Sequence, residues 1–425
     1  MPSQRLQPEY VYRDGQFVAG QAVHLADGMI DSMSDCSGGP TWKVALLPGF
    51  INAHSHAFQR GLRGKAEAFA REAGCFFSWR ETMYALVERL TDEQVYDLTL
   101  QAFNEGLSAG FTSVGEFHYV HHGSTPWSLD EVVLSAARDA GIRLSLLQAD
   151  YVRGGEGVPL TGGQQRFDTG SVESFCQSVD RLEAKLDRST QTLGLVGHSV
   201  RAVEIERIVR MKEEASQRGF VFHMHLEEVV KEIEETKAIH GCTPMRLLLD
   251  HGVIDQSTTA VHCTHSTSED LALFGAAGGI VCLCPLTEGN LGDGIPDLPA
   301  MRRAKCRVAI GSDLNARIAP LEELRLMEYT ARIANQQRGV WVDGTGSTAT
   351  ALLQAGTSGG AASLGLNAGE IAPGRLADFV AFDLNHPSLA FIEQGDLDAA
   401  ILFGAGQEAI AGVMVGGTWV RGGVS

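Results

Sequence analysis

Residues 49–56, GFINAHSH, form an apolar run that ends in two histidines separated by one residue. Seven further apolar runs follow along the chain: residues 111–118 (FTSVGEFH), 143–151 (RLSLLQADY), 193–200 (LGLVGHSV), 220–228 (FVFHMHLEE), 259–265 (TAVHCTH), 279–286 (GIVCLCPL) and 307–313 (RVAIGSD). Many of them end in polar or ionisable residues. Runs of this length, bounded by glycine or by helical patterns, are typical of buried parallel strands.

Amphipathic helical patterns separate these runs. They are residues 129–140 behind a Ser128-x-x-Glu131 capping box, 203–218 closed by Gly219, 229–240 closed by Gly241, and 321–335 after Pro320. Eight strands that alternate with helices predict an α/β fold, a (β/α)₈ TIM-like barrel, over residues 47–369. The active site of such a barrel lies at the carboxyl ends of its strands.

The two ends of the chain have a different pattern. Residues 10–33 and 378–424 are short, alternating, glycine-punctuated segments typical of β-strands. We therefore expect residues 1–46 and 370–425 to meet in one small β-sandwich domain. The connections 57–110 and 152–169 are longer than usual loops, which makes them candidates for covering a substrate or contacting another subunit.

Composition excludes several classes of partner. The chain of 425 residues has 34 Lys and Arg against 52 Asp and Glu, a formal net charge of −18. Such a chain would repel nucleic acid and anionic membranes, so an anionic ligand needs local cations. Residues 1–15 contain no apolar signal sequence, and no run of about 18 apolar residues occurs. We expect a cytoplasmic protein whose eight scattered cysteines are reduced.

Several strand ends carry residues that bind metals. These are His54 and His56 on the first strand, His223 and His225 on the fifth, His262 and His265 on the sixth, and Asp313 on the eighth. Residues two apart on a strand point to the same face, and the barrel brings all the strand ends to one rim. His54, His56, one of the two fifth-strand histidines and Asp313 are therefore predicted to bind one divalent ion.

A divalent ion at this place would lower the pKa of a bound water, and Asp313 could take the proton of that water. Glu228 lies three residues beyond His225 and could carry protons to a leaving group, although a carboxylate at a helix start is also common for structural reasons. Glu227 is expected to point away from the pocket and to tolerate substitution. The fourth strand ends in Gly197-His198-Ser199, without the lysine that a two-metal site would need.

Longer strings extend the pattern. PGFINAHSH, the His225-x-x-Glu228 spacing, VHCTH, GSD and APGRLADFV resemble the amidohydrolase superfamily. Five strings resemble one family within it, the formimidoylglutamate deiminases: HSHAFQRG at His54, FSWRETMY at Phe77, EFHYVHH at Glu116, GHSVRA at Gly197 and TEGNLGDG at Thr287. This resemblance covers nearly the whole chain.

The resemblance implies roles for individual residues. The metal ligands are His54, His56, His225 and Asp313; the catalytic residues are Glu228, His262 and Asp313; the substrate-binding residues are Gln59, Arg80, Tyr119, His198 and Arg201. It also implies one Zn²⁺ per chain, a homodimer, and hydrolysis of N-formimino-L-glutamate to N-formyl-L-glutamate and ammonia in histidine degradation. Two arginines suit the two carboxylates of that substrate, because a guanidinium binds a carboxylate bidentately.

Three alternatives stay open at this point. Another deaminase of the superfamily, acting on guanine, cytosine or adenosine, would need stacking aromatics and amide hydrogen bonds instead of paired arginines. Imidazolonepropionase is a more distant relative, and a catalytically silent barrel scaffold would have no need of the complete ligand set. His118, His121, His122, His223 and His265 receive no role, and we expect most of them to be hydrogen-bonded around the site or at the rim.

Overall fold

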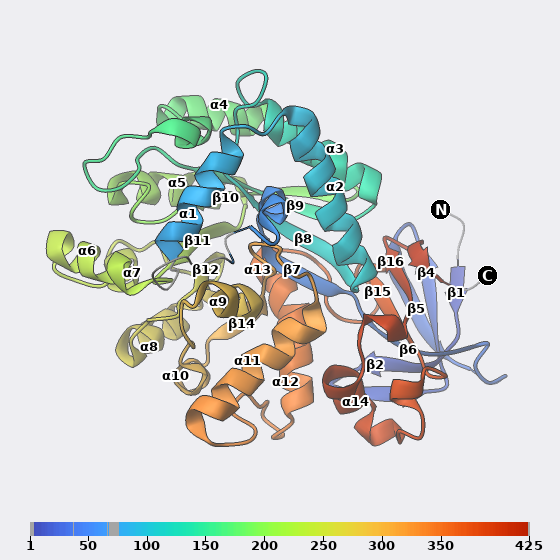
Figure 1. Cartoon of the computed structure of the whole chain (residues 1–425). Helices are drawn as coiled ribbons and strands as arrows, with labels where there is room; N and C mark the ends of the chain where they lie inside the picture. Colours follow the sequence, from blue (N-terminus) through green and yellow to red (C-terminus); the bar gives the residue numbers. More distant parts are fainter. Residues whose placement is uncertain (1–3, 37, 66, 68–75, 424–425) are drawn as a thin grey trace.

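A computed structural model describes residues 4–36, 38–65, 67 and 76–423. At its centre is an eight-stranded parallel sheet in chain order (Figure 1). Its strands are β7 (Phe50–Ser55), β8 (Phe111–His118), β9 (Arg143–Asp150), β10 (Gln191–Gly197), β11 (Phe222–Leu226), β12 (Thr258–His262), β13 (Ile280–Leu283) and β14 (Arg307–Ile310). Each of the eight predicted runs overlaps one of these strands, so the predicted barrel is confirmed.

The first and last strands of the sheet meet just beyond their carboxyl ends. Ser55 and Asp313 form a parallel β-bridge. The amide of His56 donates to the carbonyl of Asp313 at 2.9 Å, and the amide of Asp313 donates to the carbonyl of His54 at 3.0 Å. These backbone hydrogen bonds join residues far apart in the sequence and bring the eighth strand end against the first.

Helices surround the sheet in the order of the chain (Figure 1). They are α1 (Phe76–Val87), α2 (Asp92–Ser108), α3 (Ser128–Ala140), α4 (Val172–Glu183), α5 (Ile205–Arg218), α6 (Val230–His240), α7 (Pro244–Asp250), α8 (Ser268–Ala277), α9 (Pro285–Leu291), α10 (Leu298–Arg303), α11 (Pro320–Asn335), α12 (Thr348–Gln354) and α13 (Gly360–Leu364). The four predicted helices correspond to α3, α5, α6 and α11. Gly219 and Gly241 end α5 and α6 in the left-handed conformation, as predicted.

The predicted capping box of α3 is wrong. The N-cap is Trp127, whose side chain makes no capping hydrogen bond, and Ser128 is already inside the helix. The Ser128 hydroxyl instead donates to Asp92 Oδ2 at 2.9 Å, at the start of α2. A contact between neighbouring helices has replaced the local cap, which a four-residue pattern cannot show.

The two chain ends meet in two further sheets, as predicted. One sheet has the order β1-β4-β5 (Gln4–Leu6, Gln21–Ala26, Met29–Asp35). The other has the order β17-β16-β15-β6-β2-β3 (Thr418–Gly422, Ile410–Val415, Phe379–Asp383, Trp42–Pro48, Pro8–Arg13, Gln16–Ala19). The expectation of β structure throughout residues 378–424 is wrong at α14 (Leu397–Gly404), an apolar helix that packs against α11 and α12. The domain limits at residues 46/47 and 369/370 stay predictions.

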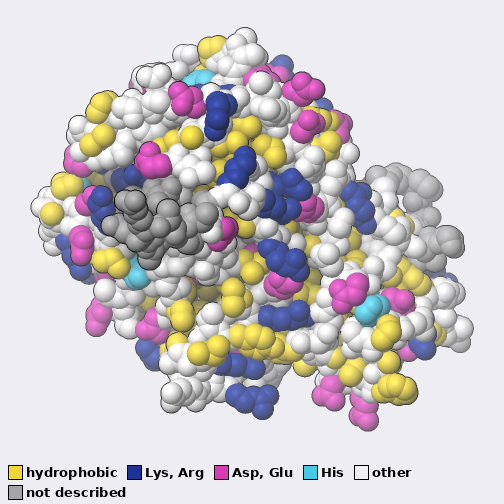
Figure 2. Space-filling view, in the orientation of Figure 1, with side chains coloured by type: hydrophobic (Ala, Val, Ile, Leu, Met, Phe, Trp, Pro, Cys, Tyr) yellow, Lys and Arg dark blue, Asp and Glu magenta, His cyan; other side chains and the backbone are white. Residues whose placement is uncertain are grey.

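Both long connections contribute helices beside the barrel: α1 from residues 57–110, and the short 3₁₀ helix Gly162–Phe167 from residues 152–169. Seven of the cysteines are free thiols, and Cys75 lies outside the described residues. On the face shown in Figure 2, acidic and basic side chains are interspersed, with several Lys and Arg near its middle. No helix within the described residues is long and apolar enough to span a bilayer.

A buried ion pair joins the barrel to the sheets of the chain ends. Arg143 begins β9, and Asp378 directly precedes β15; Nε lies 2.8 Å from Oδ2 and Nη2 3.1 Å from Oδ1. Asp378 Oδ1 also accepts the amide of Gly416 at 2.6 Å. Both side chains are buried, so each charge is stabilised by the opposite charge of its partner.

Asp378→Ala is expected to lower the free energy of unfolding by roughly 3–5 kcal/mol, because it leaves a buried guanidinium without its anion. Denaturant unfolding monitored by circular dichroism measures this loss. Glu131→Ala is the control, since Glu131 forms an exposed pair with Lys185 at 3.2 Å and its loss should change stability little. Equal effects of the two substitutions would contradict the prediction.

Candidate active site

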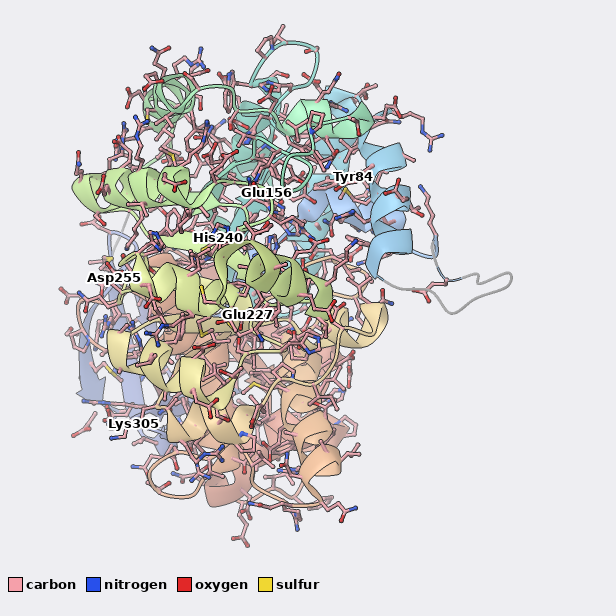
Figure 3. All side chains as sticks on the ribbon, turned by 90° about the vertical axis from the view of Figure 1, so that its left-hand side faces the viewer. Tyr84, Glu156, Glu227, His240, Asp255 and Lys305 are labelled. Atoms are coloured by element: carbon pink, nitrogen blue, oxygen red, sulfur yellow. The ribbon has the colours of Figure 1, made fainter. Side chains whose placement is uncertain are left out.

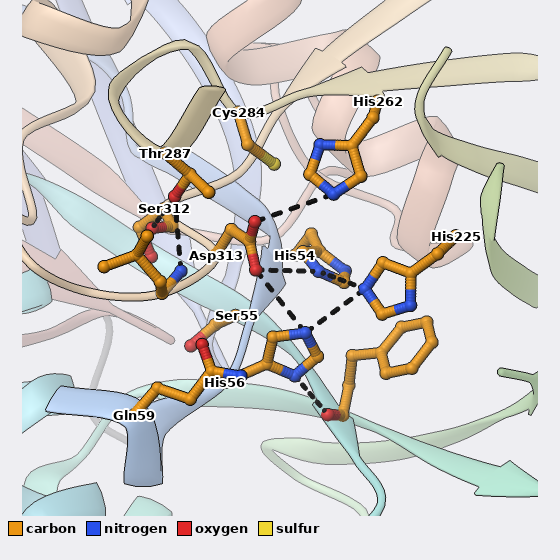
Figure 4. A network of polar contacts seen from close by, with 12 residues as sticks. His54, Ser55, His56, Gln59, His225, His262, Cys284, Thr287, Ser312 and Asp313 are labelled. Atoms are coloured by element: carbon orange, nitrogen blue, oxygen red, sulfur yellow. Dashed lines mark hydrogen bonds and ion pairs between the residues drawn. The ribbon is translucent and has the colours of Figure 1, made fainter. Parts of the chain in front are cut away.

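Four side chains converge at the carboxyl ends of the strands (Figure 4). His56 Nε2 lies 3.2 Å from His225 Nε2, and His54 Nε2 lies 3.3 Å from the same atom. Asp313 Oδ1 lies 3.4 Å from Nε2 of both His54 and His56. All four side chains are buried, and the structure thus brings together the four predicted metal ligands.

The geometry and charge of this group fit a divalent ion. Bonds of about 2.0–2.1 Å to a tetrahedral ion would separate ligand atoms by about 3.3–3.4 Å, close to the observed distances. Burial lowers the pKa of His56 to about 3, with a further contribution from His54, so the ring is neutral and its lone pair is available. Burial alone would raise the pKa of Asp313, but the His54 ring lowers it overall, which keeps the carboxylate ionised.

Hydrogen bonds behind the group fix its orientation. His56 Nδ1 donates to the carbonyl of Phe117 at 2.8 Å, which leaves Nε2 unprotonated toward the other ligands. Asn52 Nδ2 donates to Ser312 Oγ at 2.7 Å, and Asn315 Nδ2 donates to Ser55 Oγ at 3.1 Å. These two hydrogen bonds connect β7, which carries His54 and leads to His56, with residues on either side of Asp313.

The structure distinguishes between the two histidines of β11. His225 belongs to the converging group, whereas His223 Nε2 donates to the carbonyl of Ser363 on α13 at 2.8 Å. Only His225 is therefore placed as a ligand.

A second group of buried residues lies behind β8. His121 Nδ1 lies 2.8 Å from Asp130 Oδ1, and its Nε2 lies 2.8 Å from the carbonyl of Ala149. His118 Nε2 lies 3.0 Å from the same carboxylate oxygen. Both ring nitrogens of His121 thus lie within hydrogen-bond distance of protein oxygen atoms, which hold the ring in place. His122 and His265 are half-buried, and His122 Nε2 lies 2.6 Å from the carbonyl of Asp168.

Two ionisable side chains lie next to the four ligands. His262 Nε2 is 3.6 Å from both Asp313 Oδ2 and Glu228 Oε1. Burial raises the pKa of Glu228, which makes this carboxyl group a better proton carrier near neutral pH. Burial opposes a charge on His262, but Glu228 and the other carboxylates around the ring raise its pKa overall.

Glu227 points away from this pocket, as expected. Its Oε1 accepts the amide of Met245 at 2.9 Å, its Oε2 accepts the hydroxyl of Ser266 at 2.5 Å, and its backbone is left-handed with φ 54°. Figure 3 shows Glu227 beside α6 and α7, far from Tyr84 on α1. The side chain is buried, so these contacts argue against the tolerance to substitution expected from the sequence.

A pocket of about 520 Å³ opens above the four ligands. All predicted substrate-binding residues line it: Gln59, Arg80, Tyr119, His198 and Arg201. Gln59 Nε2 donates to the Tyr119 hydroxyl at 2.8 Å, and the Arg80 guanidinium lies 5.6 Å from the centre of the Tyr84 ring. Burial and the nearby Arg201 lower the pKa of His198, so this ring is neutral.

Other pocket residues were missed by sequence reasoning. They are Trp79, Met83, Tyr84, Tyr151, Phe167, Leu291 and Leu314. Four of them, on α1 and the short helix Gly162–Phe167, come from the two long connections, so the length of those connections was the available signal.

Residues 45–420 match the model of the amidohydrolase family, and the chain belongs to this family of metal-dependent hydrolases. It is 37% identical over 423 residues to the formimidoylglutamate deiminase of Pseudomonas aeruginosa, covering 98% of this chain and 92% of that protein. It is 28% identical over 377 residues to the 5-methylthioadenosine/S-adenosylhomocysteine deaminase of Moorella thermoacetica, covering 88% and 81%.

Among solved structures, the amidohydrolase from Brucella melitensis matches with a TM-score of 0.90 and 31% identity. The match covers 99% of this chain and 95% of that one. The likeness thus extends over the barrel and over the sheets built from both chain ends.

His225→Ala is expected to abolish stoichiometric metal binding, because it removes a nitrogen that lies within 3.3 Å of two other ligand atoms. Metal analysis after dialysis, together with the rise in melting temperature on adding zinc, measures the effect. His223→Ala is the matched control on the same strand and should retain the metal. Equal metal content in the two variants would contradict the ligand assignment.

Proposed function

We propose that this protein hydrolyses N-formimino-L-glutamate to N-formyl-L-glutamate and ammonia. The observation that carries the proposal is one pocket lined by Arg80 and Arg201 together with Glu228, His262 and three of the four converging metal ligands. The similarity to a formimidoylglutamate deiminase over 98% of the chain supports it. The reaction adds water to the formimino carbon and breaks the bond from that carbon to the terminal nitrogen, which leaves as ammonia.

We further propose that the ion is Zn²⁺, one per chain, held by His54, His56, His225 and Asp313. Three neutral imidazoles and one carboxylate suit zinc, and their mutual distances suit a single tetrahedral ion. When bound, zinc supplies Lewis acidity that makes water a nucleophile near neutral pH.

The side chains around the ligands move the protons. Asp313 Oδ2, which faces His262 Nε2 at 3.6 Å, takes a proton from the attacking water, and His262 supports the developing oxyanion. Glu228, whose pKa is raised by burial, delivers a proton to the departing nitrogen. The released ammonia and the new formyl oxygen account for all atoms of the water.

The upper pocket positions the substrate. The two guanidinium groups bind the two carboxylates, and this remote binding energy holds the formimino carbon above the ligands. Tyr119, held by Gln59, and the neutral His198 supply hydrogen bonds to the substrate between the two ends of the pocket.

Ammonia release by zinc-loaded protein tests the proposal across N-formimino-L-glutamate, N-formimino-L-aspartate, guanine, cytosine and adenosine derivatives. We expect the highest kcat/KM with N-formimino-L-glutamate. A preference for a nucleobase or nucleoside would overturn the proposal in favour of another deaminase. Absence of turnover with every substrate, in protein that holds zinc, would favour the scaffold alternative.

Arg201→Ala is expected to raise KM about 10- to 100-fold and to leave the zinc content unchanged, because a charge-assisted hydrogen bond contributes roughly 1.5–3 kcal/mol. Steady-state kinetics and metal analysis on the same preparation separate the two effects. Loss of zinc from this variant would show that the arginine supports the metal group instead of the substrate.

Glu228→Gln is expected to keep its zinc and to lower kcat by roughly 10²–10⁴-fold, because glutamine cannot carry a proton. Glu227→Gln is the matched control: it should lower thermal stability through its contacts with Met245 and Ser266 while kcat stays near that of the parent protein. If Glu227→Gln were the slow variant, the proton carrier would be misassigned.

The homodimer and the place in histidine degradation stay predictions drawn from the resemblance, and the cytoplasmic location stays a prediction drawn from the sequence itself. Analytical ultracentrifugation of the purified protein measures the first of these directly.

A further inference from the structure

The His262 side chain lies close to three carboxylates. Its Nε2 faces Glu228 and Asp313, each at 3.6 Å, and its Nδ1 faces Glu288 Oε1 at 3.5 Å. Glu228 and Asp313 already have roles in the proposed reaction. Glu288 belongs to the string TEGNLGDG, which the sequence analysis singled out without giving this carboxylate a role.

The backbone of His262 does not by itself hold the ring in place. His262 and Cys263 have left-handed backbones with φ 76° and 51°, so the chain turns sharply where the ring leaves β12. The ring is fully buried, and within the described residues neither of its nitrogens has a hydrogen-bond partner, although carboxylate oxygens lie 3.5 and 3.6 Å away. Contacts of this kind are often long in a ligand-free site and shorten during the reaction.

Glu288, in contrast, is anchored from both its side chain and its backbone. Its Oε1 accepts the amide of Cys284, at the start of α9, at 2.9 Å, and its own amide donates to the carbonyl of Cys284 at 2.9 Å. Glu323 of α11 holds the same helix start, because its Oε2 accepts the amide of Leu286 at 2.9 Å. The carboxylate of Glu288 therefore occupies a fixed point beside the His262 ring.

The Glu288 carboxylate is buried, with the His262 ring on one side. Glu288 is 3% exposed, and its other side lines a second cavity of about 480 Å³ formed largely by Leu283, Leu298, Leu326 and Met327. A buried carboxylate in apolar surroundings is costly unless donors face it. The amide of Cys284 donates to this carboxylate, and His262 Nδ1 lies 3.5 Å from the same oxygen, Oε1.

We propose that Glu288 is a positioning residue that holds Nδ1–H of His262 and thereby aims Nε2 at Asp313 and Glu228. The inference rests on the proposed function, in which His262 supports the developing oxyanion. Whether the ring carries one proton or two, the Nδ1 proton belongs to Glu288, and Nε2 is the nitrogen that faces the reacting atoms. An orienting acceptor of this kind commonly contributes 10- to 100-fold to activity.

Glu288→Ala is expected to lower kcat about 10- to 100-fold in zinc-loaded protein, with KM changed less than about 3-fold and zinc content unchanged. Glu288→Gln should be intermediate, because the amide oxygen still accepts from Nδ1 but carries no charge. The matched control is Glu323→Ala, which also removes a buried acceptor for an amide at the start of α9, although Glu323 forms no hydrogen bond or ion pair with His262 among the described residues. It should lower thermal stability and leave kcat near the parent value.

A second readout does not depend on the substrate. In ¹⁵N-histidine-labelled holoprotein, the Nδ1–H of His262, assigned with His262→Asn, should be protected from exchange, and this protection should be lost in Glu288→Ala and kept in Glu323→Ala. Unchanged protection in Glu288→Ala, or equal kcat losses in the two alanine variants, would overturn the inference. If the parent protein does not act on N-formimino-L-glutamate, the proposed function fails, and the exchange measurement still decides the role of Glu288.

Discussion

The backbone pairing of His54 and His56 with Asp313 is the constraint on which the site depends. Two amide-to-carbonyl hydrogen bonds, of 2.9 and 3.0 Å, close the barrel between its first and last strands. The same residues carry three of the four converging ligands. The backbone hydrogen bonds that close the barrel therefore also bring the metal ligands together. Two hydrogen bonds between Asn52 and Ser312, behind the strands, further stabilise the contact between the first and last strands.

This closure explains how so many ionisable groups can be buried at one end of an apolar barrel. The strands are lined largely by valine, leucine, isoleucine and phenylalanine, and the ionisable groups of the site gather near their carboxyl ends. Two of the buried carboxylates there lie beside nitrogen atoms: Asp313 faces His54 and His56, and Glu288 faces the amide of Cys284 and the ring of His262. Left-handed backbone at His262 and Asp313 turns these side chains inward at a local energetic cost, as is common at functional sites.

The parts that the sequence predicted well are those set by local periodicity. Eight apolar runs and the HxH spacing suffice for the barrel and for the ligand group, because barrel topology converts strand order into neighbourhood. The capping box at Ser128 failed because Asp92, from another helix, took the hydroxyl. Three features depend on tertiary packing, which no spacing in the sequence encodes. They are the choice between His223 and His225, the hydrogen bonds of Glu227 and the contact of Glu288 with His262.

The aromatic residues of the pocket bear on the choice between an acyclic and a ring substrate. A purine site needs free ring faces and amide groups, and tyrosines do line this pocket. The Tyr119 ring, however, is packed edge-on against His56, Phe58, Phe167 and His198, and Tyr151 packs against His198 in the same way. Among the described residues that line the pocket, Gln59 is the only amide side chain, and its Nε2 is engaged by Tyr119. Tyr119 and Tyr151 therefore pack against histidines, and the guanidinium groups of Arg80 and Arg201 line the same pocket, an arrangement that favours a small dicarboxylate.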